Sequence, residues 1–423
     1  MVTKWLIFCC TFISFSAALD NGLAKSPPMG WSSWSPFGRD INESIFYETA
    51  QAMIDSGMQA AGYKYVNIDG GWWKGHYTGT AVRNSSGYLE FDEKAFPKGM
   101  KALGDFYHSK GLLFGHYSAS GLHFCGGDKP ASQGYEKQDS ALFISWGIDM
   151  LKLDACGLTV EPETVVKLWE RLLNMSKRPI LFSNCHNGCE LQSGRQSWSS
   201  WCGEYTNMWR TSTDIGKSWA KILTNLDTLV GNGDKGKPGR WNDPDFLEVG
   251  NDPLTDSQNR AQFSLWCVTS APLIVGTDIR KMTKVRLGRK ADAVLFFAYL
   301  QEVRDILTNK YAIQVNQEYA GNAGDRVSQN GSAEVWAKPL PETSGLAGAK
   351  AFGVVLFNRN GTQPIDFDFQ FTALNMTSDT ECGIFDIWAQ KHMPNAKGSI
   401  KRTVPVNDVA FLRLIECQGG AVQ

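Results

Sequence analysis

Eight short segments with the pattern of buried strands recur along the chain, about 25 to 45 residues apart. They are residues 28–31, 65–69, 112–117, 150–154, 180–183, 208–214, 240–243 and 273–276. The stretches between them carry helical spacing, as in residues 45–57 and 162–173. A strand followed by a helix, repeated eight times over about 250 residues, predicts a (β/α)8 TIM barrel of the α/β class.

The pattern changes after about residue 309 to short alternating stretches that are separated by turn residues. Residues 333–337, 351–357 and 410–414 are examples. Such stretches are typical of a small antiparallel β-sandwich. The expected domains are therefore a barrel at residues 19–309 and a C-terminal β-sandwich at residues 310–423.

The chain begins with Lys4, an apolar run at 5–15 and the small residues Ser16, Ala17 and Ala18. This order predicts a secretory signal peptide at residues 1–18, whose apolar run is too short to span a bilayer. Of the 10 cysteines, two lie in that segment, and the even number left suggests disulfides. We therefore expect a glycoprotein of the secretory pathway that is secreted, lysosomal or vacuolar, with no membrane contact after signal cleavage.

The charges are balanced, with 42 Lys and Arg against 43 Asp and Glu, which gives no electrostatic footprint for nucleic acid. The 15 tryptophans suit the stacking of sugar rings, although they are also ordinary core residues. The spacing of Cys185 and Cys189 resembles half of a metal site, but no second His or Cys pair completes it nearby. A neutral small molecule is the expected partner, with no metal and no cofactor.

Two of the predicted strands, 150–154 and 208–214, deliver the carboxylates of Asp154 and Asp214 at their ends. The two-residue period of a strand places Lys152 and Asp154 on one face, and Arg210 and Asp214 on one face of the other strand. Burying such charges costs several kcal/mol unless they pair or serve a site. A buried ion pair and a functional cleft are both consistent with the first segment.

Polar and aromatic residues follow most of the predicted strands, and in a barrel all of these positions meet at one rim. They are Trp34, Asp69, Tyr117, Asp154, Asp214 and Asp245. A pair of carboxylates without a phosphate loop or a Ser-His nucleophile pattern fits cleavage of a glycosidic bond. Asp154, kept ionised by Lys152, is the expected nucleophile, and Asp214 is the expected acid/base. Arg210 is expected to bind a hydroxyl or a carboxylate.

Five motifs together resemble glycoside hydrolase family 27, which contains α-galactosidases and α-N-acetylgalactosaminidases. They are Pro28-Met29-Gly30-Trp31, Ile68-Asp69, Leu151-Lys152-Leu153-Asp154-Ala155-Cys156, Trp209-Arg210 with Asp214-Ile215, and Trp241-Asn242-Asp243-Pro244-Asp245. The resemblance runs from about residue 27 to the end of the chain. It implies a TIM barrel, a β-sandwich and a configuration-retaining mechanism, and a homodimer is compatible with it.

The resemblance also implies roles for single residues. Asp154 matches the family nucleophile, and Asp214 matches its acid/base. Cys125 and Cys156 match a disulfide that lines the pocket, and Asp243 matches a supporting residue. The positions that match sugar-binding residues are Trp34, Asp69, Tyr117, Lys152, Arg210 and Asp245.

Two loops depart from the family pattern. The family has a second Asp directly after Asp69, where this chain reads Gly70-Gly71, so one carboxylate that grips sugar hydroxyls is missing. The two glycines either change the choice of sugar or only permit a tight turn. The family also has Cys-Glu-Trp where this chain reads Cys185-His186-Asn187. His186 either replaces the Glu as a sugar-binding residue or is an ordinary loop residue.

The expected function is that of a retaining exo-α-galactosidase that hydrolyses terminal α-D-galactosyl residues. An α-N-acetylgalactosaminidase, or an enzyme for another sugar such as α-glucosyl or β-L-arabinopyranosyl units, remains an alternative because of the two departures. Transglycosylation in preference to hydrolysis is a further alternative. A carbohydrate-binding protein without catalysis fits the sequence less well because both carboxylates are present.

Overall fold

The computed structural model describes residues 21–189, 201–282 and 300–419. The predicted signal peptide, at residues 1–18, lies outside the described residues. Within these ranges no helix is long and apolar enough to cross a membrane.

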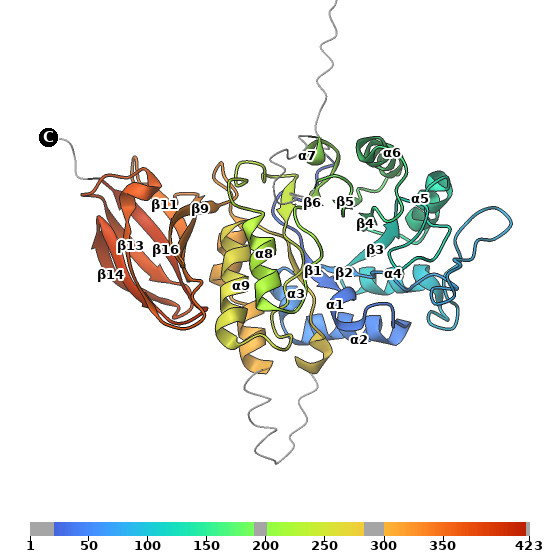
Figure 1. The fold of residues 1–423 in the computed structure, drawn as a ribbon, viewed down its shortest axis with the longest axis horizontal. Helices are drawn as coiled ribbons and strands as arrows, with labels where there is room; N and C mark the ends of the chain where they lie inside the picture. The colour runs from blue at the N-terminus through green and yellow to red at the C-terminus, as the bar shows by residue number, and fades with distance from the viewer. Residues whose placement is uncertain (1–20, 190–200, 283–299, 420–423) are drawn as a thin grey trace, which may run out of the picture.

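Eight parallel strands form one sheet in the order β7-β6-β5-β4-β3-β2-β1-β8. A parallel bridge between Leu247, just after β7, and Val275 of β8 closes this sheet into a barrel. The strands are β1 (Met29–Ser32), β2 (Tyr65–Asn67), β3 (Leu113–Ala119), β4 (Met150–Asp154), β5 (Leu181–Asn184), β6 (Met208–Arg210), β7 (Trp241–Asp243) and β8 (Leu273–Val275). The eight predicted strands and the predicted barrel are confirmed (Figure 1).

Helices connect the strands and surround the barrel (Figure 1). They are α1 (Trp34–Phe37), α2 (Glu43–Asp55), α3 (Met58–Ala61), α4 (Gly99–Ser109), α5 (Glu136–Ser145), α6 (Pro162–Asn174), α7 (Cys202–Tyr205), α8 (Trp219–Asp227), α9 (Asp256–Val268) and the 3-10 helix η1 (Ile279–Met282). Local capping fixes several starts. The Asn42 side chain accepts hydrogen bonds at the start of α2, and Thr255 forms a capping box with Gln258 at the start of α9.

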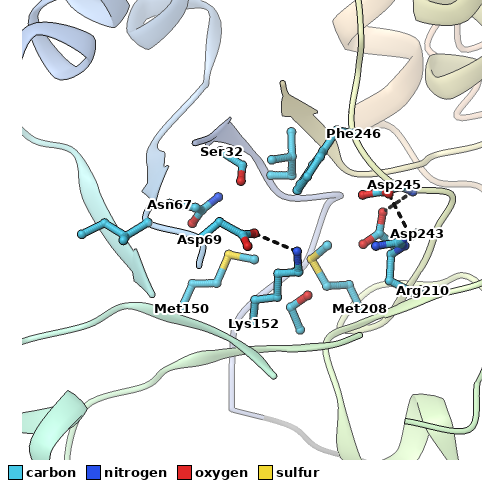
Figure 2. Close-up of a pocket in the computed structure, with 13 residues that line it drawn as sticks. Ser32, Asn67, Asp69, Met150, Lys152, Met208, Arg210, Asp243, Asp245 and Phe246 are labelled. Atoms are coloured by element: carbon cyan, nitrogen blue, oxygen red, sulfur yellow. Dashed lines mark hydrogen bonds and ion pairs between the residues drawn. The ribbon is translucent and has the colours of Figure 1, made fainter. Parts of the chain in front are cut away.

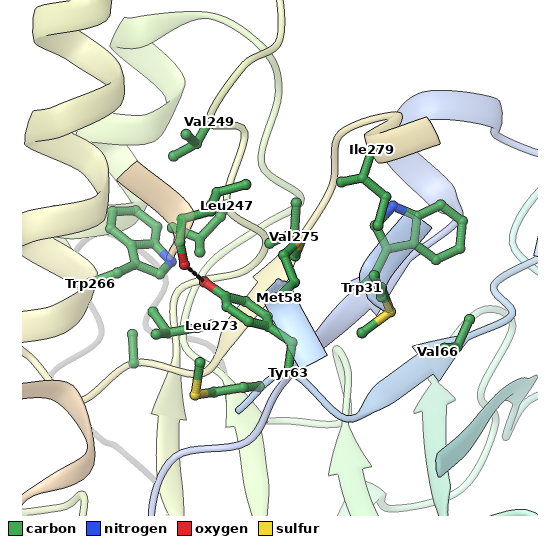
Figure 3. Packing of buried hydrophobic residues seen from close by; sticks show 14 of the residues in the cluster. Trp31, Met58, Tyr63, Val66, Leu247, Val249, Trp266, Leu273, Val275 and Ile279 are labelled. Atoms are coloured by element: carbon green, nitrogen blue, oxygen red, sulfur yellow. Dashed lines mark hydrogen bonds between the residues drawn. The ribbon is translucent and has the colours of Figure 1, made fainter. Parts of the chain in front are cut away.

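The closing edge of the barrel is filled by large apolar side chains (Figure 3). Trp31 of β1 and Val275 of β8 are fully buried there, next to Ile279 of η1. The indole Nε1 of Trp31 donates to the carbonyl of Thr277 at 2.7 Å, so the buried polar atom has a partner. This packing holds the start and the end of the barrel together.

Strand β6 is shorter than the sequence predicts. It ends at Arg210, whereas the predicted strand runs to residue 214. Its neighbour β7 ends at Asp243, and the last backbone hydrogen bond between the two strands runs from the N–H of Thr211 to the carbonyl of Asp243. Residues after Thr211 therefore have no partner in β7. Asp214 therefore lies in a loop, and strand periodicity does not place it on one face with Arg210.

The C-terminal strands form a six-stranded antiparallel sheet, in the order β14-β13-β16-β11-β10-β9, and a two-stranded sheet of β12 and β15. Their bounds are β9 (Asp325–Asn330), β10 (Ala333–Leu340), β11 (Lys350–Asn358), β12 (Ile365–Gln370), β13 (Glu381–Asp386), β14 (Lys391–Lys397), β15 (Ser399–Val404) and β16 (Val409–Gln418), with the 3-10 helix η2 (Phe371–Leu374) between them. The predicted β-sandwich is confirmed, and a disulfide joins Cys382 to Cys417 inside it. The exact domain boundary at residues 309 and 310 stays a prediction.

The two domains share an interface built on α9, which packs against β11 and β16. Trp388 donates from Nε1 to the hydroxyl of Ser264 at 3.1 Å, and Arg260 pairs with Asp408 at 2.7 Å. A further helix, α11 (Lys310–Gln317), also packs against α9. Buried residues of both domains belong to one continuous hydrophobic cluster, so the sandwich completes the core on this side of the barrel.

Lys338 of β10 is buried beside the end of α11. Its Nζ donates to the carbonyls of Val315 and Asn316 at 2.6 and 3.1 Å. These carbonyls lie in the last turn of a helix, where such groups lack helical partners. Burial lowers the pKa of Lys338 to about 7.

This shift gives a pH-dependent stability. Between pH 7 and about 10.4 the unfolded chain binds more protons at Lys338 than the folded chain does, so its contribution to the unfolding free energy rises with pH. We expect the melting temperature of the wild type, minus that of Lys338→Met, to increase from about pH 6.5 to about pH 9.5. Lys401→Met, at an exposed lysine of β15, is the control. Thermal unfolding of the three proteins measures this, and parallel curves for Lys338→Met would contradict it.

Candidate active site

The predicted site residues lie at the carboxyl ends of the barrel strands, which share one rim. Trp34 follows β1, Asp69 follows β2, Tyr117 belongs to β3, Lys152 and Asp154 belong to β4, His186 follows β5, Arg210 ends β6, Asp214 lies in the next loop, and Asp245 follows β7. Figure 2 shows the part of this site at the barrel axis, with Asp69, Lys152, Arg210, Asp243 and Asp245 around one pocket.

Lys152 pairs directly with Asp69 and not with Asp154. The Nζ of Lys152 lies 2.8 Å from Oδ2 of Asp69, and both residues are largely buried (Figure 2). Burial alone lowers the pKa of Lys152, but the charge of Asp69 outweighs it and raises this pKa. The sequence allowed either a buried ion pair or a functional cleft at this strand. Both are present, because the ion pair of Lys152 and Asp69 lines the pocket.

Asp154 is a buried carboxylate that three groups stabilise. Its Oδ1 accepts from the backbone N–H of Ala155 at 3.0 Å and lies 3.2 Å from Nδ1 of His186. The hydroxyl of Tyr117 donates to Oδ2 at 3.4 Å. Burial raises the pKa of Asp154, but the hydrogen bond from His186 and the charge of Lys152 outweigh it and hold this pKa below its usual value. Asp154 is thus kept ionised, as a nucleophile requires.

His186 lies between the two candidate catalytic carboxylates. Its Nδ1 faces Asp154, and its Nε2 lies 3.6 Å from Oδ1 of Asp214. Burial lowers the pKa of His186, but the hydrogen bond to Asp154 outweighs it and raises this pKa. The backbone of His186 has φ 57°, a left-handed conformation that is costly for a residue with a side chain. The contacts of the imidazole with Asp154 and Cys185 favour this conformation and offset part of its cost.

Asn187, the next residue, has a structural role. Its amide donates to the carbonyls of Leu153 and Cys185 at 2.9 and 3.1 Å, and its Oδ1 accepts from the hydroxyl of Ser120 at 2.8 Å. It is fully buried, so its side chain ties the loop after β5 to the neighbouring strand. In this departure from the family pattern, His186 is the residue that faces Asp154 and Asp214.

Arg210 connects Asp214 to the buried part of the site. Its Nη2 lies 3.2 Å from Oδ1 of Asp214 and 2.8 Å from Oδ2 of Asp245. The Arg210 side chain is only 2% exposed, whereas that of Asp214 is 66% exposed. Asp214 is therefore held at the open mouth of the site, where it can exchange protons with a leaving group or with water.

Asp243 and Asp245 lie beside Arg210, on the side of the pocket opposite Asp69 (Figure 2). The backbone N–H of Asp245 donates to Oδ1 of Asp243 at 2.9 Å, and Asp245 has φ 80°. Burial raises the pKa of Asp243 to about 6. The N–H of Ile215 donates to Oδ2 of Asp245 at 2.7 Å and so anchors the loop that carries Asp214.

Helix α1, which begins at Trp34, is tied to the rim by the carboxyl group of Glu248, which the sequence patterns did not reveal. Glu248 is fully buried, and it accepts from Ser35 at 2.6 Å and from Asn251 at 2.5 Å. Burial raises the pKa of Glu248 to about 7. Ser35 directly follows Trp34, so this link helps to hold Trp34 in place.

The two glycines after Asp69 differ in their physical roles. A Cβ on Gly71 would lie 2.5 Å from the carbonyl oxygen of Arg39, and Gly71 has φ 105°, so only glycine fits. A Cβ on Gly70 would instead contact Trp34 at 3.4 Å and Trp73 at 3.6 Å, which are ordinary contact distances. The fold requires Gly71, whereas the absence of a side chain at residue 70 is not a requirement of the backbone.

Three disulfides occur in the described residues. Cys125 pairs with Cys156, as the family resemblance implies, and joins the loops after β3 and β4. Cys189 pairs with Cys202, which the sequence analysis did not predict. Cys185 is a free, buried thiol 3.3 Å from Nδ1 of His186, so it also belongs to the site. The spacing between Cys185 and Cys189 did not reveal this role, because it depends on how the loop after β5 brings Cys185 and His186 to Asp154.

A parallel barrel with two carboxylates at its rim, set among buried ion pairs, is the arrangement of a glycoside hydrolase. The sequence matches the family described as alpha galactosidase A over residues 26–318. It also matches the alpha galactosidase C-terminal beta sandwich domain over residues 330–414. The chain belongs to this family, glycoside hydrolase family 27.

Individual relatives agree with this assignment. Alpha-galactosidase 2 of Arabidopsis thaliana is 38% identical over 88% of this chain and 84% of its own length. The alpha-galactosidase of Cyamopsis tetragonoloba is 36% identical over 91% of this chain and 85% of its own length. Among solved structures, alpha-galactosidase I from Mortierella vinacea has a TM-score of 0.79 at 28% identity, over 95% of this chain and 100% of that one.

The contrast between the two glycines is testable by alanine substitution. Gly71→Ala should lower the melting temperature strongly or prevent folding, because its Cβ meets backbone atoms in a left-handed conformation. Gly70→Ala should fold, and its free energy of unfolding should lie within about 0.5 kcal/mol of the wild type, because its Cβ meets Trp34 and Trp73 only at ordinary contact distances. Thermal unfolding of both variants measures this. Equal losses of stability would contradict the assignment of separate roles.

Proposed function

We propose that this chain is a retaining exo-α-galactosidase, with Asp154 as nucleophile and Asp214 as acid/base. The observation that carries the proposal is the position of His186, whose two ring nitrogens lie 3.2 Å from Asp154 and 3.6 Å from Asp214. One imidazole therefore separates a buried, ionised carboxylate from an exposed one. A retaining glycosidase needs this asymmetry between its two carboxyl groups.

The proposed reaction has two displacements at the anomeric carbon. In the first, an oxygen of Asp154 attacks while the glycosidic bond breaks and Asp214 protonates the departing oxygen, which gives a covalent glycosyl-enzyme and releases the aglycone as an alcohol. In the second, Asp214 takes a proton from water, the water oxygen attacks the same carbon, and Asp154 leaves. His186 and Lys152 stabilise the carboxylate of Asp154 before the attack and after its release.

The buried ion pairs are proposed to bind the sugar. Asp69 with Lys152, and Arg210 with Asp245, present charged donors and acceptors toward the pocket. Hydrogen bonds to charged groups are each worth about 1.5 to 3 kcal/mol, so they fix the sugar's orientation. Trp34 is proposed to form an apolar wall beside Gly70.

His186 is proposed to read the substituent at the 2-position of the sugar. Its ring takes up space between the two carboxylates, and this favours a 2-hydroxyl over a bulkier N-acetyl group. For this reason galactose is preferred here over N-acetylgalactosamine.

The three disulfides are consistent with export into an oxidising compartment. On this basis we retain secretion, or delivery to a lysosome or vacuole, as part of the proposal. The homodimer stays a prediction.

Single carboxylate variants test the two roles. Asp154→Ala should lose nearly all turnover of nitrophenyl α-galactoside, and Asp214→Ala should lose about 10²- to 10⁴-fold in kcat on a natural galactoside, with a smaller loss for the nitrophenyl leaving group. Azide should rescue both, because it is small and needs no base. It should yield the β-galactosyl azide with Asp154→Ala and the α-galactosyl azide with Asp214→Ala.

A matched control is Asp252→Asn, an exposed carboxylate in the loop region after β7, which should keep wild-type rates. Initial rates and NMR of the azide products make the measurement. The same anomer from both alanine variants would show that the two roles are wrongly assigned.

The main alternative substrate is a β-L-arabinopyranoside, and Gly70 is the observation that favours it. This pentose has the ring configuration of α-galactose without the hydroxymethyl group at carbon 5. The family carboxylate missing at Gly70 is one that grips the 4- and 6-hydroxyls, so its loss weakens the distinction between the two sugars.

Gly70→Asp on a substrate panel tests this alternative. The introduced Cβ has room beside Trp34 and Trp73, and the restored carboxylate should raise kcat/KM for α-galactoside relative to β-L-arabinopyranoside by about 10- to 100-fold. Initial rates on the two nitrophenyl glycosides, with the α-N-acetylgalactosaminide and α-glucoside as further members, measure the ratios. A wild type that already excludes arabinopyranoside would remove the alternative.

A further inference from the structure

We infer that Asp154, Cys185 and His186 form a binding site for one divalent cation of the Zn²⁺ class, and that the occupied site is inactive. The cation is an inhibitor here and not a cofactor. The binding part of the inference stands on geometry alone. The inhibition part rests on the proposed role of Asp154 as nucleophile.

Three different donor atoms converge in the pocket. Oδ1 of Asp154 lies 3.2 Å from Nδ1 of His186, and Sγ of Cys185 lies 3.3 Å from the same nitrogen. All three donors lie within 4.8 Å of one another. With Zn–N and Zn–O bonds near 2.0 Å and Zn–S near 2.3 Å, the edges of a tetrahedral site are about 3.3 to 3.6 Å long. Two edges are already within about 0.3 Å of those lengths.

The chemistry of the donors selects the class of cation. A thiolate, an imidazole and a carboxylate suit Zn²⁺, Co²⁺ and Cd²⁺, whereas Ca²⁺ and Mg²⁺ prefer oxygen ligands. The other cluster of this kind in the described residues, Cys125, Asp154 and Cys156, contains two cysteines that are joined in a disulfide. Cys189 is also in a disulfide. Cys185 is therefore the thiol that remains for a cation at Asp154.

The site can be reached and is electrically balanced. The side chains of His186 and Asp154 are 26% and 10% exposed, so a hydrated cation entering the pocket meets them first. Burial raises the pKa of the Cys185 thiol, so this group is protonated before the cation binds, and Arg210 lies 3.5 Å from its Sγ. The positive charges of Arg210 and Lys152 are already paired with Asp245 and Asp69. On binding, the cation displaces the thiol proton and the Nδ1 proton, which pass to water.

Occupancy should stop the reaction for a simple reason. The cation takes a lone pair of Asp154 Oδ1, one of the two oxygens available to attack the sugar, and it lies where the anomeric centre must approach. Zn²⁺ and substrate are therefore expected to compete, which raises KM and leaves kcat unchanged.

Cobalt spectroscopy tests the site without reference to activity. The exported chain should bind one Co²⁺ with a near-ultraviolet charge-transfer band from thiolate to metal. Cys185→Ser should lose the band, and His186→Gln should bind Co²⁺ at least about 10-fold more weakly. Cys267→Ser, at the other free buried cysteine, and His123→Gln, at a part-buried rim histidine, should keep it. No band in the wild type, or a band that survives Cys185→Ser, would overturn the site.

Zn²⁺ inhibition then separates the two parts of the inference. Competitive inhibition of galactoside hydrolysis that weakens in parallel with Co²⁺ binding in His186→Gln supports both parts. One bound Co²⁺ with unchanged turnover supports the site and overturns the inhibition, and it also contradicts Asp154 as the nucleophile. Both outcomes differ from failure of the azide experiment alone, which concerns Asp154 and Asp214 without metal.

Discussion

The site depends on the pairing of charges that the barrel buries. The side chains of Lys152 and Arg210 are largely buried, and burying an unpaired charge costs several kcal/mol. Asp69, which follows β2, and Asp245, which follows β7, provide the partners. Removing one member would leave the other uncompensated, so the four side chains hold the loops around the pocket in a fixed arrangement. The reactive carboxylates are positioned against this frame.

His186 provides Asp154 with the hydrogen bond that Lys152 does not give. Lys152 is engaged with Asp69, so it acts on Asp154 only through its charge, and the direct hydrogen bond to Asp154 comes from the imidazole instead. The same ring faces Asp214, whose exposed side chain is in contact with water. A single side chain in a strained backbone conformation thus gives the two carboxylates different surroundings. This difference is the physical requirement for one of them to attack and the other to transfer protons.

The sequence was sufficient to predict the barrel, because apolar runs bounded by polar residues repeat with the length of a βα unit, and barrel topology alone brings Asp69, Asp154 and Asp245 together. It was wrong only about the strand position of Asp214, because the Thr-rich residues after Arg210 have strand propensity while the neighbouring strand ends too early to pair with them. It also missed the contact between Cys185 and His186 and the Cys189–Cys202 disulfide. Loop conformations decide both, and cysteine spacing does not determine connectivity.

The sequence alone does not distinguish the roles of Gly70 and Gly71. They are identical neighbours, yet Gly71 is required by a positive φ and by the backbone of Arg39, while residue 70 has room for a side chain. The fold therefore requires glycine at residue 71, and it does not require glycine at residue 70. A position at the sugar pocket that is free of structural constraint is one where substrate choice can change without loss of stability. In the proposed function, the missing carboxylate at residue 70 therefore concerns sugar recognition.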